Sequence, residues 1–468
     1  MDSVITTFIS CGTPGIETRT LSFLSNQLTE ALPTGYINYV GRITYGYKNK
    51  YLAEFNAGYN GSVQFAEGKR YGFFPSVSLG YVLTNEDFWN RNWWISNLKL
   101  RGSYGTVGND ISSSTRFLYL TTMNMNVSAG YMGKEGNNYM AGIMEGQTGN
   151  QNVTWETAKK LNVGFDLGLL NNRLNLVFDW YRRDTKGMLA PGAELPAVLG
   201  ASAPLQNTAD LRSKGWEITV DWNDQIGSDF SYNVGINGAY NKNKVGNIPT
   251  EDGIIHGDVN MLYDNSPEFY RAENGHAIGY FWGYQTAGIF QNKEQIANWN
   301  ADGKHGILQS DPQPGDVIYV DQNQDGIIDD NDKVDLGNGT PDFTYGFNLG
   351  FNYKNFDFSL VAYGAAGNQI VQSYRNHANS KANYTSAILD RWTGEGTSNR
   401  IPRVTNTNIN WQFSDLYIQD GDYLRISNIT LGYDFAKLIN VKAISQARLY
   451  FQVQNAFTFT KYDGMDPE

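Results

Sequence analysis

The sequence predicts an all-β protein: an antiparallel transmembrane β-barrel that is incomplete, with about twelve strands and long extracellular loops. Its 468 residues include 50 Gly and 30 Tyr, and only 18% are charged, a composition that suits strands and turns. Many short runs alternate apolar with polar residues, as in a wall with one lipid-facing and one polar face. No apolar run approaches the ~20 residues of a membrane-spanning helix, so a membrane protein with this sequence must be a barrel.

Bulk properties exclude several classes of function. The net charge of -11 argues against nucleic-acid binding, which needs basic patches, and allows an acidic outer face that binds divalent cations. Cys11 is the single cysteine, which rules out an internal disulfide framework and a multi-cysteine metal site. Residues 1–20 show no basic segment followed by an apolar core, so we expect no signal peptide there and therefore an incomplete barrel.

The segment 161–184 predicts a hairpin with a definite register. Apolar residues alternate with small or polar ones on both sides of Asn171-Asn172, a two-residue turn that tolerates positive φ. This turn places Asp166 and Asp179 on the same face, opposite the apolar residues. The predicted cross-strand pairs are Leu169 with Leu174, Leu167 with Leu176, Phe165 with Phe178, and Val163 with Trp180.

A second hairpin is predicted around Lys354-Asn355 by the same test. Aromatic and aliphatic residues between 343 and 353 line up with those between 356 and 362, opposite small and polar residues. Two independent hairpins therefore agree. Further runs with a period of two lie at 216–222, 230–236 and 449–453.

The strands are connected alternately by short and long segments, the arrangement of periplasmic turns and extracellular loops in porin-type barrels. The predicted strands are 36–47, 51–62, 71–83, 97–108, 157–170, 173–184, 213–223, 229–242, 343–353, 356–366, 422–435 and 447–459. The long connections are 109–156, 185–212, 243–342 and 367–421. We expect residues 1–35 to be a loop segment that leads into the barrel of residues 36–468. A further hairpin within 243–342 would keep the alternation.

The same alternation leaves the last strand pointing outward. At least one closing strand is then expected to be missing, because an open sheet edge facing lipid leaves backbone groups unpaired at several kcal/mol each.

The segment 321–332 has the spacing of an EF-hand-type calcium loop. Oxygen-bearing side chains occupy loop positions one, three, five, nine and twelve, with Gly at six, and the residue at seven offers its carbonyl. Asp at position twelve replaces the usual Glu, and Pro and Gly flank the loop instead of helices. The predicted calcium ligands are Asp321, Asn323, Asp325, Ile327, Asp329 and Asp332. The alternative is an acidic, solvated turn; a bound ion would make the loop rigid rather than catalyse.

Two further groups of residues are candidates for contact with a ligand or partner. Polar residues of the alternating strands would face the lumen, and we select Asp166, Asp179, Asp221, Asn233 and Asn348. Loop aromatics next to Asn, Gln and Asp would stack on sugar rings or contact a partner protein. The candidates are Tyr280, Trp282, Trp299, Trp392 and Trp411. These aromatics equally fit a membrane-interface girdle or packing within the loops.

No catalytic site is predicted. The acid pair Glu251-Asp252 invites a glycosidase interpretation, but neighbouring acids arise by chance among 47 acidic residues. Neither a Gly-rich phosphate loop nor a nucleophile elbow accompanies the pair. The four histidines lie in polar stretches without a second His at helical spacing, and we expect them on the surface.

Several segments, in order from about residue 36 to the end, resemble SusC-like TonB-dependent outer-membrane transporters. They are Gly41–Asn49 (GRITYGYKN), Tyr51–Gly61 (YLAEFNAGYNG), Phe74–Gly80 (FPSVSLG), Leu98–Asn109 (LKLRGSYGTVGN), Asn207–Trp216 (NTADLRSKGW), Pro314–Gly346, Ile418–Tyr433 (IQDGDYLRISNITLGY) and Leu449–Pro467. The resemblance implies the C-terminal part of a 22-stranded barrel with an N-terminal plug, energised by TonB. It also implies a SusD-like surface lipoprotein as partner and import of an oligosaccharide or peptide across the outer membrane.

Three alternatives to the importer stay open. A passive porin-type channel would lack the plug. A calcium-dependent, glycan-binding extracellular β-protein would be soluble without detergent. A fragment with no activity of its own would give no folded, heat-modifiable barrel.

Overall fold

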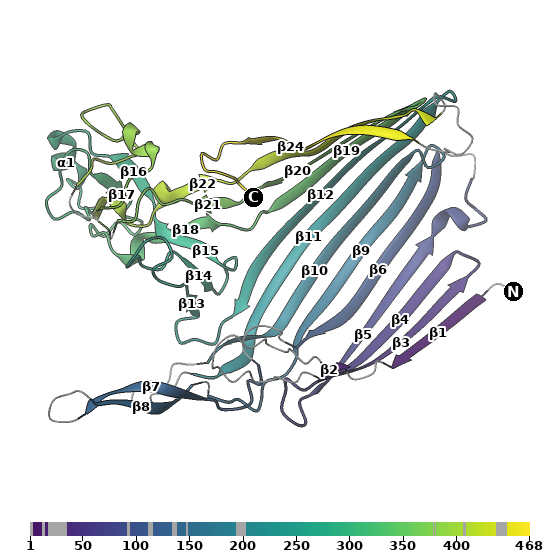
Figure 1. The fold of residues 1–468 in the computed structure, drawn as a ribbon, viewed down its shortest axis with the longest axis horizontal. Helices are drawn as coiled ribbons and strands as arrows, with labels where there is room; N and C mark the ends of the chain where they lie inside the picture. Colours follow the sequence, from purple (N-terminus) through teal and green to yellow (C-terminus); the bar gives the residue numbers. More distant parts are fainter. Residues whose placement is uncertain are drawn as a thin grey trace. The chain divides into compact units, whose positions relative to one another are not determined.

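The structure, a computed structural model, describes residues 3–11, 15–16, 35–90, 94–110, 116–132, 138–146, 148–192, 203–377, 379, 381–405, 409–436 and 447–468 (Figure 1). The chain forms two units, Met1–Asp224 with Lys242–Ile254, and Gln225–Asn241 with Ile255–Glu468. Among the described residues, no helix is both long and apolar enough to span a bilayer.

The first unit is an antiparallel sheet in which each long strand pairs with the next one along the chain. Its order is β1-β3-β4-β5-β6-β9-β10-β11. The bounds are β1 (Ser3–Cys11), β3 (Gly35–Tyr47), β4 (Tyr51–Ser62), β5 (Tyr71–Val82), β6 (Ile95–Asn109), β9 (Glu156–Leu169), β10 (Leu174–Pro191) and β11 (Leu205–Ile226). The short β2 (Gly15–Ile16) also pairs with β3, and β7 (Met123–Met132) forms a separate hairpin with β8 (Asn138–Glu145).

The second unit has the same up-and-down order, β12-β19-β20-β23-β24. The bounds are β12 (Phe230–Asn247), β19 (Phe343–Tyr353), β20 (Phe356–Ala366), β23 (Tyr423–Asp434) and β24 (Arg448–Thr460). All twelve strands expected from the sequence are therefore present. Both hairpin registers are confirmed pair by pair, from Leu169 with Leu174 to Val163 with Trp180, and from Tyr353 with Phe356 to Phe347 with Ala362.

Residues 255–342 and 367–421, which we call the loop module, fold into small sheets of their own. One sheet has the order β13-β14-β15-β18, and β16 pairs with β17 and β21 with β22. The bounds are β13 (Ile254–His256), β14 (Tyr270–Glu273), β15 (Tyr280–Tyr284), β16 (Thr286–Ile289), α1 (Lys293–Trp299), β17 (Val317–Tyr319), β18 (Lys333–Asn338), β21 (Gln369–Val371) and β22 (Ile418–Asp420). Short 3-10 helices lie in the module at Asp330–Asp332, Ser386–Asp390, Ile409–Trp411 and Asp415–Tyr417, and another lies in the first unit at Leu83–Asn85. The sequence predicted at most one extra hairpin in residues 243–342, and this segment contains more strands than that.

The core of the loop module explains why these loops are ordered. Ten buried residues, mostly aromatic, form one hydrophobic cluster: Tyr284, Val317, Tyr319, Ile328, Tyr374, Ile401, Trp411, Phe413, Leu416 and Tyr417. The buried Asp316 carboxylate joins both long segments, because it accepts hydrogen bonds from Arg403 Nε and Asn410 Nδ2, each at 2.7 Å. Each segment thus buries apolar surface that it would expose alone.

Two further expectations need correction. Residues 3–11 were expected in a loop but form β1, which pairs with β3 from Ser3–Tyr47 to Cys11–Tyr39. The connection 185–212 is shorter than expected, because β10 and β11 stay paired as far as Pro191 and Leu205 through bulges near Met188. Polar residues such as Asn207 interrupt the apolar alternation there, while the backbone pairing continues.

The apolar face of β3, β4 and β5 carries two ladders of stacked tyrosines. Tyr39 stacks on Tyr59 and Tyr59 on Tyr71, with ring centroids 6.4 and 5.1 Å apart. Tyr47 stacks on Tyr51 and Tyr51 on Tyr81, at 6.4 and 5.1 Å. Between the ladders this face presents Ile43, Phe55 and Val77, all exposed. Aromatic ladders that flank an apolar band are typical of a sheet standing in a membrane.

Candidate functional site

Arg101 organises the polar face of the first unit. Its Nε donates to Asp166 Oδ1 at 2.8 Å, and its Nη1 and Nη2 donate to the two oxygens of Asp179 at 3.1 and 2.8 Å. Lys99 Nζ lies 3.9 Å from Asp166. The structure thus brings together two predicted lumen-facing residues, Asp166 and Asp179, and adds Arg101, which the sequence reasoning missed. Arg101 lies between Leu100 and Gly102 in sequence. The period of two along a strand therefore places it on the polar face, and the sequence alone could have identified it.

Gly164 makes this ion pair possible. Arg101 is paired with Gly164, and Gly164 with Asp179, on three successive strands. A Cβ at Gly164 would lie 2.4 Å from Phe178 O and 2.6 Å from Asp179 Oδ1. The missing side chain lets the guanidinium cross the middle strand and reach both oxygens of Asp179, a bidentate geometry that strengthens a charge-assisted pair.

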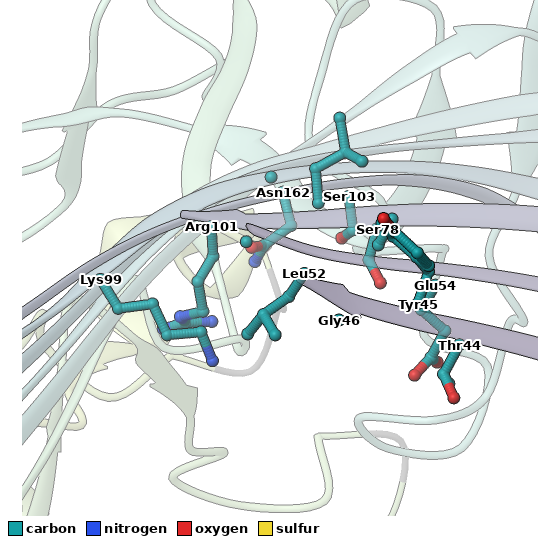
Figure 2. A pocket seen from close by; sticks show the side chains of 14 residues that line it. Thr44, Tyr45, Gly46, Leu52, Glu54, Ser78, Lys99, Arg101, Ser103 and Asn162 are labelled. Atoms are coloured by element: carbon teal, nitrogen blue, oxygen red, sulfur yellow. The ribbon is translucent and has the colours of Figure 1, made fainter. Parts of the chain in front are cut away.

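A hollow of about 460 Å³ opens beside Arg101 (Figure 2). It covers two neighbouring rungs of the sheet, one running Gly46-Leu52-Gly80-Arg101 and the other Thr44-Glu54-Ser78-Ser103-Asn162. Small residues leave the space open, and Figure 2 shows Lys99 and Arg101 at one end and Glu54 at the other. The hollow therefore has a mostly apolar lining and carries opposite charges at its two ends.

The other predicted polar-face residues agree with the register but do not join this cluster. Asp221 shares the face of Asp179, because Asn175 pairs with Asp221 and Asp179 with Glu217. In the second unit, Asn233 is paired with Gly350 and Asn348 with Gly235, which puts both asparagines on one face.

The predicted calcium loop has two buried carboxylates. Asp332 is fully buried, and its two oxygens accept the backbone N–H groups of Gln322 and Asp329 at 2.8 Å each. Asp321 is 5% exposed and accepts N–H groups from Gly306, Gln324 and Gly326 at 3.0, 2.6 and 2.9 Å. Burial raises the pKa of Asp321, but the backbone hydrogen bonds from Gly306 and Gly326 outweigh it and hold the pKa below its ordinary value.

The remaining predicted ligands make bonds within the loop. Asn323 Oδ1 accepts Asp325 N, Asp325 Oδ1 accepts Ile327 N, and Asp329 Oδ1 accepts Asn331 N, at 2.8–3.0 Å. Gly326 has φ +82°, as the sharp turn at loop position six requires. Within the described part of the chain, no three His, Cys, Asp or Glu side chains gather around one metal position. Calcium binding at this loop stays a prediction.

Two of the aromatic contact candidates are core residues. Trp411 is 1% and Tyr280 2% exposed, so the expectation that they contact a ligand is wrong: they pack inside the loop module. Trp282 is partly exposed, but it carries the Arg271 guanidinium carbon 3.3 Å and the Lys333 Nζ 4.3 Å from its ring centroid. Cations already occupy its ring face.

Trp392 and Trp299 are also partly exposed, and they differ in their hydrogen bonding. Trp392 Nε1 donates to Gln291 Oε1 at 3.2 Å. Trp299 Nε1 is buried and has no hydrogen-bond acceptor among the described residues.

One histidine departs from the expected surface position. His377 is 7% exposed and stacks on Trp411, with ring centroids 4.7 Å apart. Burial, with a smaller contribution from the Arg375 charge, lowers the pKa of His377 to about 4. It is neutral at physiological pH.

A sheet with one apolar face, aromatic ladders and a charged opposite face defines a membrane β-barrel wall. Residues 41–456 match the family described as TonB dependent receptor-like, beta-barrel, and the chain belongs to this family. Its members are outer-membrane receptors and transporters, which places the chain in the outer membrane.

Curated relatives and solved structures agree with this assignment. TonB-dependent receptor P3 of Formosa agariphila is 31% identical over 450 residues, covering 93% of this chain and 43% of that protein. TonB-dependent receptor SusC of Bacteroides thetaiotaomicron is 29% identical over 456 residues, covering 95% and 42%. The structure of the RagAB peptide transporter shares the fold, with TM-score 0.75, 22% identity, and coverage of 96% of this chain and 47% of that chain. The chain thus spans less than half the length of these relatives.

Proposed function

We propose that this chain is the C-terminal barrel part of a SusC-like importer that takes up an oligosaccharide or peptide, and that it catalyses no reaction. The observation that carries the proposal is the 29% identity with SusC along 95% of the chain. A second observation supports the proposal: the polar face of the first unit has a hollow with charged residues, Arg101, Lys99 and Glu54. On this proposal the passage is lined by polar side chains that keep it hydrated: Asp166, Asp179, Asp221, Asn233 and Asn348.

We propose two partners on the same basis. The TonB system would supply energy through a plug contributed by the rest of the protein, and a SusD-like lipoprotein would cover the extracellular side. The ordered loop module supports the second, because a rigid surface binds a partner without the entropic cost of ordering loops.

Deletion of the gene in its native host tests the proposal. Uptake of radiolabelled neutral oligosaccharides and of short peptides is compared in wild-type, deleted and complemented cells, with and without a protonophore. An importer of this kind loses uptake of one substrate class on deletion and also when the proton gradient collapses. Uptake that survives the protonophore would indicate the passive porin instead, and uptake unchanged by deletion would overturn import altogether.

We also propose that residues 321–332 bind calcium. The donor set consists of oxygen only, which suits this hard cation, and the buried Asp321 and Asp332 side chains already anchor the two ends of the loop through backbone hydrogen bonds. Binding requires Asp325 and Asp329 to turn from their present backbone hydrogen bonds toward the ion. The role of the ion would be to rigidify the loop module.

A further inference from the structure

A second hollow, of about 430 Å³, lies in the loop module at the end of α1. Its lining is unlike that of the Arg101 hollow, because it contains neither lysine nor arginine. The lining residues are Gln295, Asn298, Trp299, Ala301, Asp302 and His305. One indole ring, two carboxamides, one carboxylate and one imidazole therefore border a single space.

Helix geometry places three of these residues together. Gln295, Asn298 and Trp299 are three and four residues apart in sequence, a spacing that puts them on one helical face. The helix start is fixed by Asn292, whose side chain accepts the Gln295 backbone N–H at 2.9 Å, and by the Gln295 side chain, which accepts Gln291 N at 2.7 Å. The pocket wall is thus held by caps before any ligand arrives.

The opposite wall, residues 300–306, is held by the predicted calcium loop. Asn300 Oδ1 accepts the His305 backbone N–H at 3.0 Å, and Gly306 N donates to the buried Asp321 at 3.0 Å. A Cβ on Gly306 would lie 2.8 Å from the backbone of Ile327 and Ile328, so the two loops are in close contact. The pocket is therefore preorganised from both sides.

Trp299 supplies the aromatic part of the pocket lining. Its indole packs edge-on against Phe290, at 5.9 Å and 88°, and lies 5.1 Å from the His305 ring. Its Nε1 donor is buried without an acceptor among the described residues. The accessible part of this side chain is therefore ring surface, which suits stacking.

The pocket lining offers no lysine or arginine to an anionic ligand. Asp302 is its only acidic lining residue and lies 3.8 Å from His305 Nε2, with both side chains about half exposed. Carboxylate and carboxamide groups offer acceptors and donors to hydroxyl groups, and an indole offers an apolar surface to the C–H face of a ring. Few polar groups placed around an aromatic residue are typical of small-molecule sites.

We propose that this pocket is a subsite for one neutral hexopyranose unit of an oligosaccharide, with Trp299 as the platform and Asn298 and Asp302 as hydroxyl partners. The inference rests on the proposed import function and narrows its substrate class to a glycan.

Binding to the full chain in detergent tests the subsite. Maltohexaose, cellohexaose and mannohexaose are titrated by calorimetry, with tetra-alanine as the peptide probe. We expect one hexaose to bind and Trp299→Ala to weaken it at least tenfold. Trp299→Phe keeps a smaller aromatic ring and should retain part of the affinity, as expected of a stacking platform. Lys293→Ala, on the same helix but outside the lining, is the matched control and should bind like the wild type.

Several outcomes would overturn the subsite. Binding of none of the three hexaoses, equal affinity of wild type and Trp299→Ala, or binding of tetra-alanine alone would each do so. Near-UV circular dichroism of each variant detects a loop module that has failed to fold, and Trp299→Phe carries the test if Trp299→Ala fails. The gene-deletion experiment distinguishes the two levels: peptide import without glycan binding removes the subsite but keeps the importer, whereas hexaose binding without any loss of uptake on deletion removes the importer.

Discussion

Arg101 and Asp179 are 78 residues apart in sequence, yet they form a two-bond pair across an intervening strand. Their side chains are 29% and 15% exposed, so water screens them only in part. The same guanidinium holds Asp166, which also lies 3.9 Å from Lys99 Nζ, so Arg101 and Lys99 together offset the two carboxylates on the polar face.

Arg101→Gln should lower the free energy of unfolding by about 1.5–3 kcal/mol, the usual range for hydrogen bonds to charged groups. The loss arises because both aspartates lose their donor. Urea unfolding of the detergent-solubilised chain, followed by heat-modifiable gel migration, measures it. Arg173→Gln is the control: its partner Asp224 is 3.4 Å away and Arg173 is 55% exposed, so the expected cost is at most about 1 kcal/mol. Equal effects would contradict the special role of Arg101.

Gly164→Ala should destabilise the chain at least as much, because the new methyl group meets Phe178 O and the Asp179 carboxylate. Gly102→Ala is the matched control on the adjacent strand, where nothing lies within 4 Å of the added Cβ. It should be neutral or slightly stabilising, since alanine restricts the unfolded chain more than glycine does. The same urea measurement decides, and a tolerated Gly164→Ala would mean that the strands shift easily here.

Asp321→Asn and Asp332→Asn should each weaken calcium binding at least tenfold in titrations of the chain in chelator-treated buffer. Both replace a buried carboxyl group that anchors one end of the loop. Asp330→Asn is the control, because the Asp330 side chain is 77% exposed and lies outside the predicted ligand set. The calcium proposal would be abandoned if the wild-type chain showed no calcium-dependent heat or no rise in thermal stability.

His377 should make the loop module sensitive to acid. The unfolded chain takes up a proton near pH 6.5, whereas folded His377 does so near pH 4, so the unfolded state binds more protons in this window. Stability is therefore full above about pH 6.5 and falls as the pH drops toward 4, by at most about 1.4 kcal/mol per pH unit. Tryptophan fluorescence during urea unfolding at pH 4.5, 5.5 and 7 measures this slope. His377→Phe, which can still stack on Trp411, should flatten it; an unchanged slope would assign the effect to other groups.

The strands were predictable because their period of two and their turns constrain each other. A slip of one residue would have placed Asp166 among leucines, and the observed register does not slip. The candidate sites were less predictable. Tyr280 and Trp411 were selected as aromatics in polar loops, but burial in the loop module depends on partners far away in sequence. Tyr263, for example, lies 148 residues from Trp411, and its hydroxyl reaches Trp411 O at 3.5 Å. Local pattern carries no information about such contacts.

The two tyrosine ladders set the position of the first unit's sheet along the membrane normal. From Tyr39 to Tyr47 there are eight residue steps, roughly 26 Å of strand, which a tilt of ~40° projects to ~20 Å along the membrane normal. Phenol rings favour the headgroup level, so each ladder is expected to lie at one of the two membrane–water interfaces. A thicker membrane would have to thin locally, or the strands would have to stand more upright. The length of the lipid chains is therefore expected to influence the tilt of these strands, whether or not a substrate is bound.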